Sequence, residues 1–127
     1  MVEAGSQTEA PDIETMRETV NRLLEPDAVP EALPPAADEL GTLTLLLREH
    51  LDLLMPQVEQ RAKRLPKDSV TRFCAFACLG EARDRLRATP SSAPGGDVAY
   101  GRRLARVLNA LCDHYENVSA GHQGAGQ

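Results

Sequence analysis

Cysteine is the residue type in this chain with the clearest capacity for chemistry. Cys74 and Cys78 are four residues apart, so their thiols share one face of a helix. With Cys112, His114 or His50 completing the set, they make a candidate zinc or copper site. Familiar zinc motifs bring cysteines together on knuckles and turns. The metal hypothesis therefore competes with a structural interpretation of the same thiols.

That structural interpretation is burial of the uncharged run at residues 73–80, which interrupts an otherwise charged amphipathic segment. A helix that is apolar all round for two turns is normally enclosed by other helices, and a free cysteine packs as a small hydrophobe. We expect Phe76 and the flanking thiols to lie at the centre of the fold. A catalytic thiol needs access and a low pKa, which apolar surroundings oppose.

The tripeptide Cys112-Asp113-His114 does not make a nucleophilic site. Adjacent helical residues diverge by about 100°, so Cys112 and His114 point apart. No nucleophile, base and orienting group can be assembled elsewhere in the chain. The sequence therefore predicts no catalytic residue, no cofactor and no enzymatic activity.

Arginines form the other notable set. Three end one predicted helix, where cations complement the helix dipole, and three open the next, where the dipole disfavours them. An antiparallel connection brings the six together at one end of a bundle: Arg83, Arg85, Arg87, Arg102, Arg103 and Arg106. We predict a patch for an anionic ligand or an acidic partner, such as a carrier protein with its phosphopantetheine arm. Two alternatives stay open: the acidic N-terminal segment folds back on the patch, or the arginines are merely solvated.

Composition indicates the fold class. The chain has 127 residues, 42% hydrophobic and only 3% aromatic, with no tryptophan, so leucine and alanine must do the packing. No segment alternates between apolar and polar residues with a period of two, as a half-buried strand would. We predict an all-α protein with one helical domain over residues 11–118.

The net charge and the lengths of the apolar segments limit the classes of function that this chain can have. Residues 1–40 carry 2 − 10 = −8 and residues 41–127 carry 12 − 9 = +3, for a net charge of −5. This balance argues against a general nucleic-acid binder. The N-terminus lacks a secretory pattern, and no apolar run reaches the roughly 20 residues of a membrane span. We expect a cytoplasmic protein with free thiols and no membrane contact.

Periodicity predicts four helices, at about 12–24, 38–64, 69–87 and 97–118. The expected caps are Asp12, then Asp68 or Ser69, then Asp97. Pro56 predicts a kink in the second helix, with a break into two helices as the alternative. We expect three antiparallel core helices with the first helix laid against them. Residues 1–10 and 119–127 are expected to be disordered, and 25–37 to form a proline-rich linker.

The second predicted helix carries more leucine than its neighbours can cover. The surplus can mark an interface, including a symmetric dimer, unless the first helix covers it: Leu45, Leu46, Leu47, Leu53 and Leu54.

Three stretches resemble a known family: residues 65–68 (LPKD), 74–83 (CAFACLGEAR) and 100–115, beginning YGRRLAR and ending ALCDHY. The chain is similar over about residues 40–116 to small all-helical actinobacterial proteins. These proteins carry a domain of unknown function and are labelled natural product biosynthesis proteins. The resemblance implies a cytosolic accessory role and supplies no catalytic residue, cofactor or substrate.

Our hypothesis is a non-enzymatic helical accessory or adaptor protein that acts through protein–protein contacts, in natural product biosynthesis or its regulation. The partner is another protein or a second copy. The alternative is a thiol-based regulator that binds a metal or a small ligand through Cys74, Cys78 and Cys112.

Overall fold

The computed structural model describes residues 10–24 and 36–123, and within these residues the protein is a bundle of four helices without strands. They are α2 (Ile13–Leu24), α3 (Ala37–Lys63), α4 (Val70–Arg87) and α5 (Gly96–Gln123). The predicted all-α fold is confirmed. The expected disorder at residues 1–9 and most of the proline-rich linker, residues 25–35, lie outside the described residues. Within the described ranges, no helix combines the length and apolar character needed to cross a bilayer.

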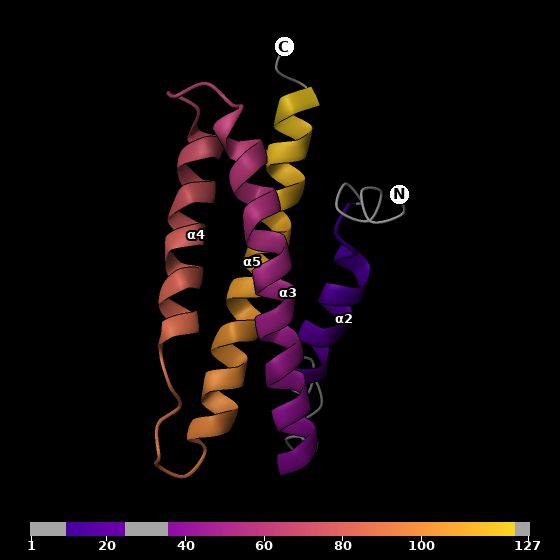
Figure 1. The fold of residues 1–127 in the computed structure, drawn as a ribbon, viewed down its shortest axis with the longest axis vertical. Coiled ribbons are helices and arrows are strands. Elements are labelled where there is room, and N and C mark those ends of the chain that lie inside the picture. Colours follow the sequence, from indigo (N-terminus) through magenta and orange to yellow (C-terminus); the bar gives the residue numbers. More distant parts are fainter. Residues whose placement is uncertain (1–9, 25–35, 124–127) are drawn as a thin grey trace, which may run out of the picture.

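Successive helices run in opposite directions, and α3 and α5 each pack against all three other described helices (Figure 1). α3 and α4 are neighbours, and α2 lies on α5 and α3 without reaching α4. The predicted arrangement of three core helices with an N-terminal helix against them is therefore correct. Because α4 touches only α3 and α5, much of its circumference has no neighbour among the described helices.

The core follows the predicted leucine periodicity. Its fully buried large side chains come from all four helices: Val20, Leu23, Leu47, Leu51, Leu54, Val58, Leu79, Leu104, Leu108, Leu111 and Val118. Gly101 permits the close approach of three helices, since a Cβ there would lie 3.3 Å from Leu23 Cδ1 and 3.4 Å from Leu40 Cδ1.

Two of the predicted helix caps are correct. Asp12 Oδ1 accepts a hydrogen bond of 3.1 Å from the Thr15 amide, and Ser69 Oγ accepts one of 3.1 Å from the Arg72 amide. The predicted Asp97 cap is wrong because α5 already begins at Gly96. Gly95, at φ 80°, supplies the left-handed turn before the helix.

One predicted alternative for α3 and one predicted boundary of α5 are wrong. α3 runs without interruption through Pro56, so the alternative of two shorter helices is wrong, and the kink itself stays a prediction. α5 continues to Gln123, whereas we expected its end at Val118 and disorder from residue 119. Residues 124–127 lie outside the described part of the chain.

Candidate functional site

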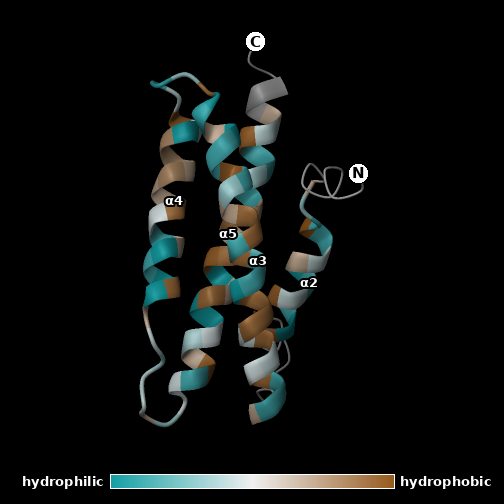
Figure 2. Ribbon diagram, in the orientation of Figure 1, coloured by the Kyte–Doolittle hydropathy of each residue, from teal (hydrophilic) through white to brown (hydrophobic). Residues whose placement is uncertain are grey.

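The uncharged run at residues 73–80 lies at the edge of the bundle, which overturns the prediction that it forms the centre. One side of it is buried, with Ala75, Cys78 and Leu79 packed inward. The other side faces water: Phe73 is 74% exposed, and Cys74 is exposed beside it. The first half of α4 is accordingly coloured as apolar although it lies at the edge of the molecule (Figure 2).

The exposed residues of this helix recur at three- and four-residue spacing and so form one continuous stripe. We call it the α4 face and define it by Val70, Phe73, Cys74 and Ala77, all of which are exposed. Val70 is 74% exposed, like Phe73. Large apolar side chains left in water on a small protein indicate a contact surface.

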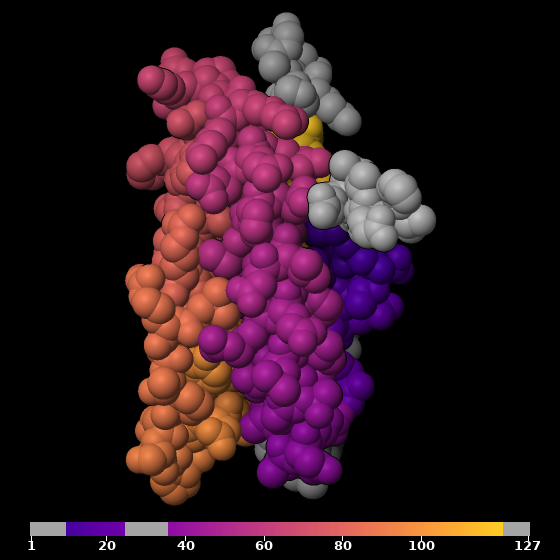
Figure 3. Space-filling model, in the orientation of Figure 1, coloured from indigo at the N-terminus to yellow at the C-terminus, as the bar shows by residue number. Residues whose placement is uncertain are grey.

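A second apolar surface lies on α3, which crosses the front of the molecule between α2 and α4 (Figure 3). We call it the α3 face and define it by Leu45, Leu46 and Leu53, which are 64%, 37% and 65% exposed. The exposed carboxylates of Glu49 and Asp52 lie among these leucines. The predicted surplus of leucine is therefore real for these three positions.

The other two leucines of the predicted surplus, Leu47 and Leu54, are fully buried. They belong to the inward stripe of α3 and contribute to the core. They therefore play no part in the α3 face.

The three cysteines do not form one site. Cys74 is exposed, so the prediction that both thiols of α4 are sealed from water is wrong for it. Burial raises the pKa of Cys78 to about 11, with Glu81 and Asp113 adding to the effect. Burial likewise raises the pKa of Cys112 to about 11, although Arg17 opposes the shift. Among the described residues, no group of three or more His, Cys, Asp or Glu side chains could hold a metal ion.

His50 packs between α3 and α2. Its Nε2 lies 3.2 Å from Thr19 Oγ1, and the ring is half-buried. Burial lowers the pKa of His50, while the charges of Glu49 and Asp12 oppose that shift. His114 is also half-buried.

The six arginines of the predicted patch are divided among different partners. Those on α4 form ion pairs: Arg83 with Glu59 of α3 at 3.8 Å, Arg85 with Glu81 at 3.3 Å and Arg87 with Asp84 at 2.5 Å. Two of these pairs lie within α4 and one joins it to α3. The α4 arginines therefore do not form a bare cationic surface.

The α5 members of the set diverge as well. Arg102 Nε donates to the backbone oxygen of Leu23 at 3.4 Å, on the α2 side of the bundle, while Arg103 and Arg106 are exposed. The ends of α4 and α5 are neighbours as expected, joined by residues 88–95 (Figure 1). Anion binding by Arg83, Arg85, Arg87, Arg102, Arg103 and Arg106 stays a prediction.

Two arginines that the sequence analysis did not single out hold helices together. Arg48 donates to the Tyr100 hydroxyl and, at 3.2 Å, to the Leu86 carbonyl, so it joins α3 to α5 and α4. Arg72 donates to the carbonyls of Lys63 and Leu65 at 3.0 and 3.1 Å and thereby satisfies the end of α3. A signal for Arg48 was present, because it is the first charge after an uninterrupted run of leucines and threonines.

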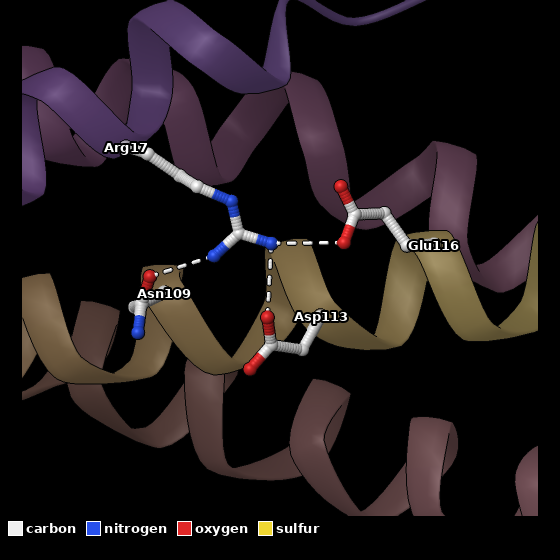
Figure 4. A network of polar contacts seen from close by, with 4 residues as sticks. All are labelled: Arg17, Asn109, Asp113 and Glu116. Carbon is white, nitrogen blue, oxygen red and sulfur yellow. Dashed lines mark hydrogen bonds and ion pairs between the residues drawn. The ribbon is translucent and has the colours of Figure 1, made fainter.

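Arg17 performs a similar role for α2 (Figure 4). Its guanidinium donates to Asn109 Oδ1 at 2.9 Å, Asp113 Oδ1 at 2.9 Å and Glu116 Oε1 at 3.1 Å. The three acceptors lie four and three residues apart on α5 and thus share one face. The sequence shows the spacing of these three residues, but it does not show that Arg17 of α2 binds them.

A shallow cavity of about 350 Å³ lies where α3 meets the start of α5. Its lining includes Leu40, Gly41, Thr44, Leu45, Pro90 and Tyr100. Asp97 also lines it and supplies one exposed carboxylate at its rim. The cavity adjoins the α3 face through Leu45, so it adds concave apolar surface to that face.

The described residues thus form a helical scaffold with two exposed apolar faces, one on α3 and one on α4. No curated protein and no solved structure matches the chain. The model of a family of unknown function, DUF6415, matches residues 14–120, which include all of α3 and α4 and most of α2 and α5. The chain therefore belongs to the DUF6415 family.

Proposed function

We propose that this protein is a non-enzymatic accessory protein that binds another protein through the α3 face. The observation that carries the proposal is the exposure of Leu45 and Leu53, which have nearly two thirds of their surface in water. The same helix buries Leu47, Leu51 and Leu54 completely. Its sequence thus has enough leucine for the core and a separate set directed outward.

The charges of the α3 face indicate what kind of partner fits it. Glu49 and Asp52 are exposed among the leucines, and Asp38 is exposed in the first turn of the helix. An amphipathic helix with basic flanks meets this surface best, because its apolar side covers the leucines and its cations meet the acids. The cavity beside Leu45 accepts one protruding side chain of that helix.

We place this contact in the cytoplasm and, following the sequence resemblance, among the proteins of natural product biosynthesis or its regulation. All three cysteines are free thiols, which supports a reducing compartment. The thiol-based regulator receives no comparable support, because Cys74 is exposed while Cys78 and Cys112 are buried.

The experiment replaces the outward leucines without changing charge. The double variant Leu45→Gln, Leu53→Gln keeps the buried stripe and should fold normally. We expect it to lose the partner recovered by in-cell photo-crosslinking from a probe placed at Leu46. The matched control is Arg103→Gln, Arg106→Gln, which alters two exposed residues of α5.

Retention of the crosslinked partner by the leucine variant contradicts the proposal. If only the arginine variant loses the crosslinked partner, the docking surface is the predicted arginine patch and not the α3 face. Absence of any crosslink from Leu46 in cells that express the neighbouring genes also counts against an α3 docking surface.

A further inference from the structure

We infer that two copies of this chain associate through the α4 face, in an antiparallel arrangement about a two-fold axis. This inference adds to the proposed function and does not depend on it, because it uses the other apolar surface. Val70 and Phe73 are each 74% exposed, the highest values among the large apolar residues described. The exposed stripe spans two turns, which is the length of a helix–helix contact seam.

Gly80 provides an independent observation on the same helix. A Cβ at this position would meet nothing within 4 Å, and the residue has no positive φ, so neither packing within the chain nor backbone geometry requires glycine. Glycine is among the least favourable residues inside a helix. A glycine here lets another backbone approach α4 closely, in line with the exposed apolar residues of the same face.

The sizes of the residues on this side of α4 select a second copy as the occupant. Large side chains, Val70 and Phe73, occupy the first part of the helix, and small residues, Ala77 and Gly80, follow. The pairs 73 with 77 and 70 with 80 are both centred on position 75. One two-fold axis at that level therefore places each large residue of one copy against a small residue of the other.

The charges fit the same register. Lys67 is exposed before the first turn of α4, and Glu81 and Asp84 are exposed towards its end. In the antiparallel pair, Lys67 of each copy lies at the level between these two acids of the other. Their ion pairs with Arg85 and Arg87 are on the surface and leave oxygen atoms open to a further cation. Arg83 is directed instead to Glu59 of its own α3.

The α3 face does not fit a second copy in this way. Its exposed charges are the acids Glu49 and Asp52, so two such faces would repel each other. Self-association therefore belongs to α4, and the α3 face stays available to another protein.

The test measures the mass of the full chain by sedimentation velocity over a range of concentrations under reducing conditions. We expect a reversible dimer. Phe73→Gln should raise the dimer dissociation constant at least about 100-fold, because a symmetric interface loses two buried phenylalanine side chains. Leu53→Gln on the α3 face is the matched control and should leave the constant unchanged.

A second pair of variants tests the close approach. Gly80→Leu fills the open position and should abolish dimerisation, whereas Gly41→Leu should not, although a Cβ at Gly41 also meets nothing within 4 Å. Circular dichroism checks that both variants stay helical. A dimer that survives both Phe73→Gln and Gly80→Leu overturns the inference, as does a monomer at every concentration.

Cys74 tests the antiparallel register, since it lies one residue from the proposed axis. Two copper(II) phenanthroline complexes each accept one electron and become copper(I), while two thiols lose their protons and form one disulfide bond. We expect a covalent dimer that is absent from Cys74→Ser. If no crosslink forms, the proposed register is wrong.

The two proposals can fail separately. If the chain is a monomer but the double variant Leu45→Gln, Leu53→Gln still loses its partner, only the self-association is contradicted. If the chain is a dimer but the double variant keeps its partner, only the proposed function is contradicted.

Discussion

A guanidinium nitrogen of Arg17 lies 2.9 Å from a carboxylate oxygen of Asp113, although the residues are 96 positions apart in the sequence. The same nitrogen lies 3.1 Å from Glu116, so one side chain of α2 joins two acids of α5. The apolar residues Met16, Val20 and Leu23 are buried on the same helix. Arg17 therefore fixes the orientation of α2 while the apolar residues supply most of its binding energy.

Replacing Arg17 with methionine should lower the free energy of unfolding by about 1 kcal/mol, because a partly exposed set of charged hydrogen bonds is lost. Urea unfolding followed by circular dichroism measures the change. Arg17→Lys should recover part of it, since lysine keeps the charge without the forked donors. Arg106→Met is the control on an exposed position of α5. Equal effects of Arg17→Met and Arg106→Met would show that the network adds nothing.

Leu53 and Leu54 are adjacent in the sequence and opposite in environment, being 65% and 0% exposed. Leu54→Ala should lower the free energy of unfolding by about 2 to 5 kcal/mol, because it leaves a cavity in the core. Leu53→Ala should change it by less than about 0.5 kcal/mol. Chemical denaturation of the two variants under identical conditions provides the comparison, and similar losses would contradict the assigned orientation of α3.

The three thiols should react at very different rates. Cys74 is exposed, whereas Cys78 and Cys112 are buried and their pKa values are raised to about 11. Titration of the native protein with an aromatic disulfide reagent should modify one thiol rapidly. Cys74→Ser should remove that phase, and unfolding should release the other two. Rapid modification of two thiols in the native protein would contradict this arrangement.

The raised thiol pKa values also predict a loss of stability in alkali. In the unfolded chain these thiols ionise near their ordinary value of 9.0, whereas in the folded protein they keep their protons to about pH 11. The stabilisation is therefore complete below pH 9 and is lost as the pH rises through 11. Unfolding measured between these values should show a shallower pH dependence for Cys78→Ala than for the original chain.

His50 predicts a loss of stability on the acid side. Burial against α2 lowers its pKa, so the unfolded chain takes up a proton before the folded protein does. Stability should fall as the pH decreases below the ordinary value of 6.5. His50→Gln should flatten this dependence, and a fall of the same size in the variant would assign the effect to carboxylates instead.

The local signals in the sequence were sufficient for the helices and for two of their caps. Asp12 and Ser69 accept hydrogen bonds from amides three residues later, which depends only on the next turn of chain. The leucine stripe of α3 was equally legible, because polar residues between the leucines define the opposite face. That contrast allowed the buried set of α3 and a surplus of leucine to be anticipated, although the predicted surplus wrongly included the buried Leu47 and Leu54.

Only the tertiary structure decided which side of residues 73–80 is buried. This run contains no charged residue to mark an outer face, so its pattern cannot distinguish a helix enclosed on all sides from one at an edge. Contact of α4 with α3 and α5 alone places Phe73 in water and Cys78 in the core. The partners of the arginines also depend on the tertiary structure, because their long side chains bind the carboxylates and carbonyls that the packed helices bring within reach.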